Sequence, residues 1–197
     1  MQTAIGKIPV RPPLQIFAMS VSSLLTQIEL SLASSNAEQR KFWAREIKRQ
    51  ELKLNDFLPI LHGQHKTAQR FTWLITDIAE VHPPFVIEAL PLLFSLRDDM
   101  PFSGMHRSVA KWLQMTGVPK SVEKEAIPQL LEWVANDQAC IASKSFAAKA
   151  LVDLVAAGRL ERQLARDAIA TQMGQGTPAF SARMVKLLEK LESLPSF

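Results

Sequence analysis

The sequence has no tyrosine, a single cysteine and only seven glycines among 197 residues. One cysteine cannot form a disulfide within the chain, so nothing favours an oxidising compartment, and we expect a cytoplasmic protein. Scarce glycine beside abundant leucine and alanine favours helices over sheets. There is no continuous apolar run of about 18 residues, so we expect no membrane-spanning helix and no membrane partner.

The first 13 residues differ from the rest of the chain. Pro12-Pro13 interrupts the apolar stretch that follows Lys7 and Arg11, which argues against the alternative of a cleaved signal peptide. We therefore expect an extended N-terminal tail over residues 1–13 and one domain over residues 14–197. A chain of this length buries roughly 70% of its unfolded surface, which is enough for a core without disulfides or metals.

Three prolines recur within apolar segments that have helical spacing. Pro59, Pro91 and Pro128 lie 32 and 37 residues apart. A proline inside a helix costs about 3 kcal/mol, so three at similar intervals indicate a repeated, kinked helix.

A second set of similar segments falls between the prolines. Residues 110–113 match residues 148–151 at an offset of 38, and residues 146–151 match residues 180–185 at an offset of 34. Small and large residues at helical spacing are typical of closely packed helices. The two sets predict about five helix pairs. The first helices are expected near 14–33, 50–62, 84–98, 121–136 and 159–173, and the second near 36–48, 66–81, 105–116, 139–157 and 178–193.

Local signals support these boundaries. Ser35 with Glu38 predicts a capping box, Gly117 follows a helix end, and Thr177-Pro178 supplies an N-cap with proline at the first helical position. Alternating apolar and polar runs are missing, which argues against strands.

The repeat, with its proline in the first helix, its acidic turn (Asp98-Asp99, Asn136-Asp137) and its small residues in the second helix, resembles the HEAT repeat over residues 50–193 and more weakly before them. The resemblance implies an all-α, right-handed α-solenoid of the armadillo-like kind that binds proteins.

The chain also resembles, more narrowly, a family of short, uncharacterised bacterial HEAT-repeat proteins sometimes labelled adenylosuccinate lyase. The matching segments are Trp73-Leu74, residues 106–114, residues 141–147 and residues 180–183. The chain is far shorter than that lyase and lacks its Gly-Ser-Ser-rich loop, so we do not expect lyase activity.

No residue pattern predicts catalysis or a cofactor. His62 and His65 supply too few ligands for a metal, and the loop Gly174–Thr177 lacks the lysine and preceding strand of a phosphate-binding loop. Cys140 sits between apolar residues and is interpreted as a small core residue. We expect no enzyme activity, no metal and no cofactor.

The four tryptophans Trp43, Trp73, Trp112 and Trp133 each lie at an apolar helical position, which favours core packing. The alternative is that one of them is exposed and stacks on nucleic-acid bases, as in HEAT-like DNA-alkylation glycosylases. Asp77, one turn after Trp73, would then be the catalytic acid.

Basic residues recur at equivalent positions of the predicted second helices. The candidate binding residues are Lys41, Lys111, Lys149 and Arg183, with Arg107 and Lys144 nearby. In a solenoid such residues form a stripe along one face, although ordinary surface lysines would give the same pattern.

Two hypotheses follow. The favoured one is a non-catalytic scaffold whose concave face binds a protein or peptide through a broad groove. The weaker alternative is a DNA-binding or DNA-repair protein, in which Lys111, Lys149 and Arg183 share one groove with an exposed tryptophan and Asp77.

Overall fold

The computed structural model describes residues 20–99 and 104–195, so the predicted tail over residues 1–13 lies outside the described residues. Within them every regular element is a helix and no strand occurs, which confirms the all-α prediction. The elements are α1 (Val21–Ser31), η1 (Leu32–Ser34), α2 (Ala37–Arg49), η2 (Leu54–Phe57), α3 (Leu58–Leu61), α4 (His65–Val81), α5 (Pro83–Ser95), α6 (Met105–Thr116), η3 (Lys120–Val122), α7 (Glu123–Ala135), α8 (Ile141–Ala156), α9 (Arg162–Ala170) and α10 (Pro178–Glu192).

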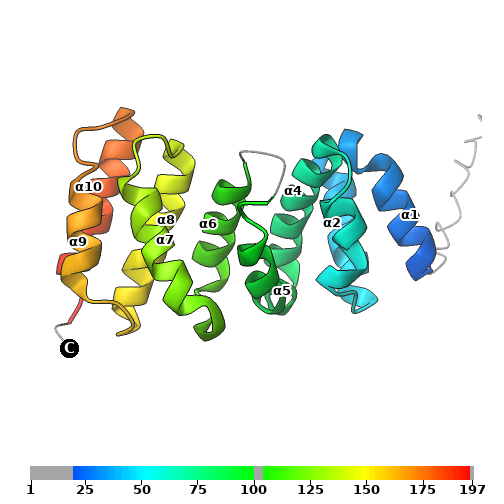
Figure 1. Ribbon diagram of the computed structural model, residues 1–197, viewed down its shortest axis with the longest axis horizontal. Coiled ribbons are helices and arrows are strands. Elements are labelled where there is room, and N and C mark those ends of the chain that lie inside the picture. The colour runs from blue at the N-terminus through cyan, green and yellow to red at the C-terminus, as the bar shows by residue number, and fades with distance from the viewer. Residues whose placement is uncertain (1–19, 100–103, 196–197) are drawn as a thin grey trace, which may run out of the picture.

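The helices follow one another in chain order along the long axis of the molecule (Figure 1). The elements α2, α4, α6, α8 and α10 form a continuous row in which each helix packs against the next. The remaining helices lie against this row: α3 contacts α4, α5 contacts α4 and α6, α7 contacts α8, and α9 contacts α8 and α10. The face of the row is therefore built from residues far apart in sequence.

A single hydrophobic cluster runs from Leu24 in α1 to Leu191 in α10. Its largest fully buried side chains include Trp112, Phe57 and Phe71, and the last two rings lie 5.1 Å apart. Each such side chain contributes about 1.5–3 kcal/mol when it is removed from water. The described helices thus share one continuous core.

The predicted second helices agree closely with α2, α4, α6, α8 and α10. Among the first helices, Pro91 and Pro128 do lie inside α5 and α7, as predicted. Pro59 does not lie inside a long helix. It stands in the first turn of the four-residue α3, where its missing N–H is no loss, so the predicted helix 50–62 is wrong in length.

Two of the three predicted end signals are confirmed. The Thr177 side chain accepts a hydrogen bond from the Phe180 backbone at the start of α10, and Gly117 ends α6 with a φ of 81° that favours glycine. The capping box of α2 lies one residue later than predicted, because Asn36 and Gln39 form it.

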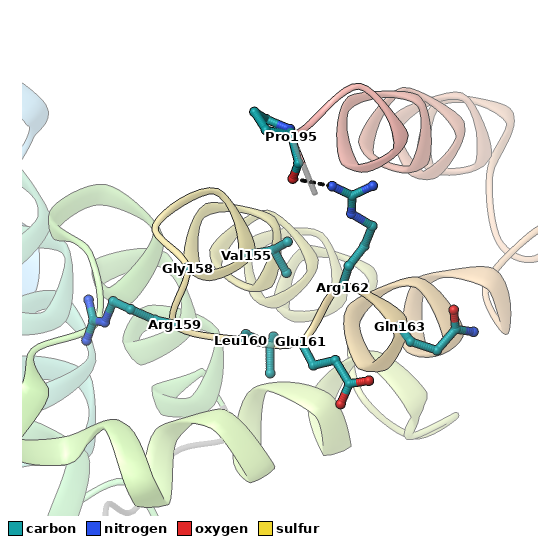
Figure 2. A pocket seen from close by; sticks show the side chains of 8 residues that line it. All are labelled: Val155, Gly158, Arg159, Leu160, Glu161, Arg162, Gln163 and Pro195. Atoms are coloured by element: carbon teal, nitrogen blue, oxygen red, sulfur yellow. Dashed lines mark hydrogen bonds between the residues drawn. The ribbon is translucent and has the colours of Figure 1, made fainter. Parts of the chain in front are cut away.

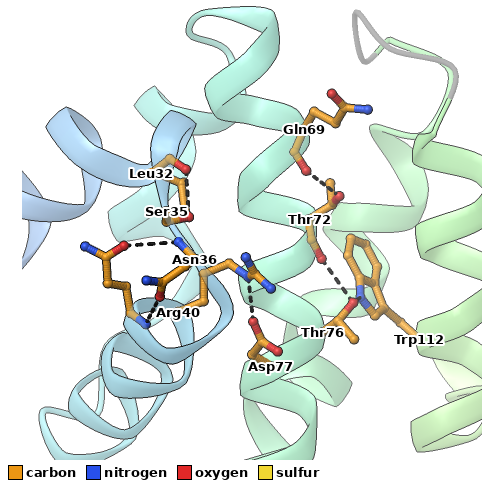
Figure 3. Close-up of polar contacts among 10 residues, drawn as sticks. Leu32, Ser35, Asn36, Arg40, Gln69, Thr72, Thr76, Asp77 and Trp112 are labelled. Atoms are coloured by element: carbon orange, nitrogen blue, oxygen red, sulfur yellow. Dashed lines mark hydrogen bonds and ion pairs between the residues drawn. The ribbon is translucent and has the colours of Figure 1, made fainter.

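Two polar contacts join the row across its helices (Figure 3). Arg40 of α2 donates from Nε to Asp77 Oδ2 of α4 at 2.8 Å. Trp112 of α6 donates from Nε1 to Thr76 Oγ1 of α4 at 3.0 Å. Thr76 and Asp77 are adjacent, so α4 is held from both sides at one level.

Candidate binding groove

Two adjoining pockets share the side chains of Trp73 and Arg107. The larger has a volume of about 930 Å³ and is lined by Gln69, Trp73, Asp98, Gly104, His106, Arg107, Gln129, Glu132, Trp133, Asn136, Gln138, Ala139, Cys140 and Ser143. The smaller has a volume of about 320 Å³ and is lined by Arg40, Trp73, Thr76, Asp77, Glu80, Arg107, Ser108, Lys111, Ala142 and Phe146. We call the two together the Trp73 groove.

Trp73 forms the wall between the pockets. Trp43, Trp112 and Trp133 are at most 2% exposed, so the prediction of core packing is confirmed for them. Trp73 instead is half-buried. The guanidinium of Arg70 lies 4.2 Å from its ring centroid and that of Arg40 lies 5.5 Å away. These cation–π contacts hold the indole in place and occupy ring surface that a stacked base would need.

The smaller pocket has cations on its α2 and α6 walls. The Arg40–Asp77 pair is mostly buried, with each side chain 12% exposed. Arg107 and Lys111 are one helical turn apart on α6, and neither forms an ion pair or hydrogen bond with another described residue. These two cations are thus available to an anionic group of a bound molecule.

The larger pocket contains more carboxylates than cations. His106 Nε2 lies 3.0 Å from Asp98 Oδ1, and the His106 ring packs against the Trp133 ring at 5.4 Å. Glu132, on α7, is exposed and accepts a hydrogen bond from Gln129. The lining includes one arginine, Arg107, and Asp98 is also paired with Arg97 at 3.3 Å.

Cys140 is not a core residue, so the sequence interpretation of this thiol is wrong. It is exposed, lines the larger pocket and occupies the N-cap of α8, where its sulfur accepts from the Ser143 backbone N–H at 3.5 Å. Partial burial favours the neutral thiol. Hydrogen bonds from Ser143 and the Ala142 backbone, together with the charge of Arg107, outweigh burial and lower the pKa of Cys140.

The six basic residues proposed from the sequence do not share one surface feature. Only Arg107 and Lys111 line the Trp73 groove. Lys144 is 6% exposed and donates to Gln172 Oε1 at 2.8 Å, and Lys149 pairs with Asp153 on its own helix. The other two, Lys41 on α2 and Arg183 on α10, are exposed and line neither pocket.

Three features of the groove were not predicted from the sequence. Arg40 and Arg70 reach Trp73 from α2 and from the preceding turn of α4, and His106 packs on Trp133. The i, i+3 spacing of Arg70 and Trp73 on one helix was the only signal that could have shown one of them.

A separate pocket lies at the junction of α8 and α9, with a volume of about 550 Å³. Figure 2 shows the guanidinium of Arg162 directed at the Pro195 carbonyl, to which it donates at 2.5 Å. Arg162 also donates to the Leu194 carbonyl at 2.5 Å. Both arginines of this pocket are therefore engaged within the protein, Arg162 with the chain after α10 and Arg159 with Glu123.

Among residues 20–99 and 104–195, no three His, Cys, Asp or Glu side chains are placed to hold a metal ion together. No helix in the same part of the chain combines the length and apolar character needed to span a membrane.

Comparison with known protein families, with curated proteins and with solved structures finds no match to this chain.

Proposed function

We propose that the protein is a non-catalytic, cytoplasmic binding module that uses the Trp73 groove to hold an extended segment of a partner protein. In this proposal the helices form a short, right-handed α-solenoid of about five HEAT-like pairs. The continuous row of α2, α4, α6, α8 and α10, with the other helices laid against it, supports the architecture.

The observation that carries the proposal is the shared wall of the two pockets. Because Trp73 and Arg107 line both, the pockets form one open groove that passes over α2, α4, α6, α7 and the start of α8. An open groove of this kind suits a chain segment that places side chains in successive pockets, whereas a small substrate is usually enclosed. Half-buried aromatic and arginine side chains are also the residues that dominate protein interfaces.

The charges of the groove favour a protein over a nucleic acid. The larger pocket has two carboxylates and one cation, and the smaller has three cations and two carboxylates. A phosphate backbone requires a surplus of cations along its whole path. Lys149 and Arg183, which the nucleic-acid hypothesis needs in the same groove, line neither pocket.

Selection from a displayed random-peptide library tests this function. We expect the full chain to enrich peptides whose affinity for a Trp73→Ala variant is roughly tenfold weaker or more, because an aromatic at the centre of an interface typically contributes at least this much. A second variant, Ala142→Arg, fills the smaller pocket without creating a cavity. It is expected to weaken peptide affinity to the same extent. Lys186→Glu on α10, exposed and outside the groove, is the matched control and retains affinity.

Failure of the selection to yield any peptide that depends on Trp73 would overturn the proposal. Salt-dependent binding of duplex DNA that is lost in a Lys111→Glu, Lys149→Glu and Arg183→Glu triple variant would support the nucleic-acid hypothesis in its place.

A further inference from the structure

Charges of opposite sign are separated along the Trp73 groove. Lys111 lines only the smaller pocket, Asp98 and Glu132 line only the larger pocket, and Arg107 stands where the two pockets meet and lines both. A partner segment that crosses both pockets therefore meets a positive wall and then a negative one. The separation therefore predicts the charges of the partner segment, which the pocket volumes alone do not.

Two of the three cations of the smaller pocket form no ion pair with a described residue. Arg40 is paired with Asp77 at 2.8 Å, but Arg107 and Lys111 have no partner among the described residues. They stand one turn apart, about 6 Å along α6. Glu80 is the only other carboxylate of this pocket and lies on the α4 wall. One carboxylate of a partner would fit between the two α6 cations.

The larger pocket favours a cationic group of the partner. Glu132 is exposed on α7 and makes no ion pair among the described residues, while Asp98 is 60% exposed and shares its carboxylate with Arg97 and His106. A lysine or arginine side chain of a partner matches these groups.

Resting on the proposed function, we infer that the partner segment carries an acidic side chain, which enters between Arg107 and Lys111, and a basic side chain, which enters the larger pocket beside Glu132.

The peptide selection is repeated against charge-reversed chains to test this inference. Peptides selected on the parent protein are expected to share an acidic and a basic residue at a constant spacing. Lys111→Glu weakens them roughly tenfold and selects a basic residue at the acidic position, and Glu132→Lys does the converse. Lys186→Glu is the matched reversal outside the groove and changes neither preference.

A compensating swap gives the strongest readout. A peptide with its two charges exchanged is expected to bind the Lys111→Glu, Glu132→Lys double variant better than the parent does. If a reversal impairs folding, as judged by thermal unfolding, Lys111→Gln and Glu132→Gln give the same comparison with smaller changes.

The outcomes separate the inference from the function on which it rests. Peptides that depend on Trp73 but show no charge pattern, or whose pattern the reversals leave unchanged, overturn the inference and leave the binding function in place. The absence of any peptide that depends on Trp73, or a preference for duplex DNA, overturns both.

Discussion

Replacement of Asp77 by asparagine separates a structural role of this carboxylate from a catalytic one. Asp77 accepts from Arg40 Nε at 2.8 Å, and both side chains are only 12% exposed. The substitution keeps the size of the side chain but leaves a mostly buried guanidinium without its counter-charge. A lost charge-assisted hydrogen bond at such a site costs about 2–3 kcal/mol.

The loss is large enough to measure by thermal unfolding. For a chain of this length each kcal/mol corresponds to about 2–4 °C, so Asp77→Asn should lower the Tm by about 4–12 °C. Glu80→Gln is the matched control, because Glu80 lies on the same helix and lines the same pocket but is exposed and forms no ion pair or hydrogen bond through its side chain with a described residue. We expect that control to change stability by less than about 0.5 kcal/mol.

A double-mutant cycle with Arg40→Gln isolates the pair. The two substitutions together should destabilise the protein by clearly less than the sum of the single effects, because each alone removes the same contact. Equal effects of Asp77→Asn and Glu80→Gln, with no coupling to Arg40, would refute the reasoning and leave Asp77 free for a chemical role.

Three further predictions follow from the groove and its walls. Alkylation of Cys140 should reach half its maximal rate at a lower pH in the folded protein than in the unfolded chain, because Ser143 and its other neighbours lower the pKa of the thiol. Iodide should quench the fluorescence of Trp73 but hardly that of the three buried tryptophans, and Trp73→Phe should remove the quenched fraction. Thr76→Val should destabilise the protein by about 1–3 kcal/mol, because the buried N–H of Trp112 loses its acceptor.

Each of these predictions has a control and a contrary result. Ser143→Ala should raise the alkylation midpoint, and a midpoint equal to that of the unfolded chain would contradict the lowered pKa. A quenched fraction that survives Trp73→Phe would contradict the burial of the other indoles. Thr26→Val, at an exposed position of α1, is the control for Thr76→Val and should leave stability nearly unchanged.

The lowered pKa of Cys140 also has a consequence for stability. Because the thiol ionises at a lower pH in the folded state than in the unfolded state, ionisation stabilises the fold at pH values above the unfolded-state pKa. This contribution is lost as the pH falls through the folded-state pKa.

The positions of the helices could be predicted from the sequence because their signals are local. The predicted helix 105–116 coincides with α6, since its apolar spacing lies within the element and Gly117 follows it directly. The predicted helix 159–173 shortens to α9, because Gly158 takes a φ of 66° and the chain turns before Arg162. Residues 14–19 of the first predicted helix lie outside the described residues.

The groove could not be predicted, because its residues are brought together by packing. Lys149 occupies the position of Lys111 in the repeat, yet it pairs with Asp153 on its own helix and lines neither pocket of the groove. Equivalent positions in the repeat therefore do not have equivalent environments. Cys140 has apolar neighbours in sequence, but its place at the start of α8 turns it toward the pocket.

The indole N–H resonances of the four tryptophans test the central claim most directly, because they report on the groove and on the core in one spectrum. On titration with a selected peptide we expect large shifts for Trp73 and smaller ones for Trp133, which also lines the groove. Trp43 and Trp112 should stay in place. An unchanged Trp73 resonance at saturating peptide would contradict binding in the Trp73 groove.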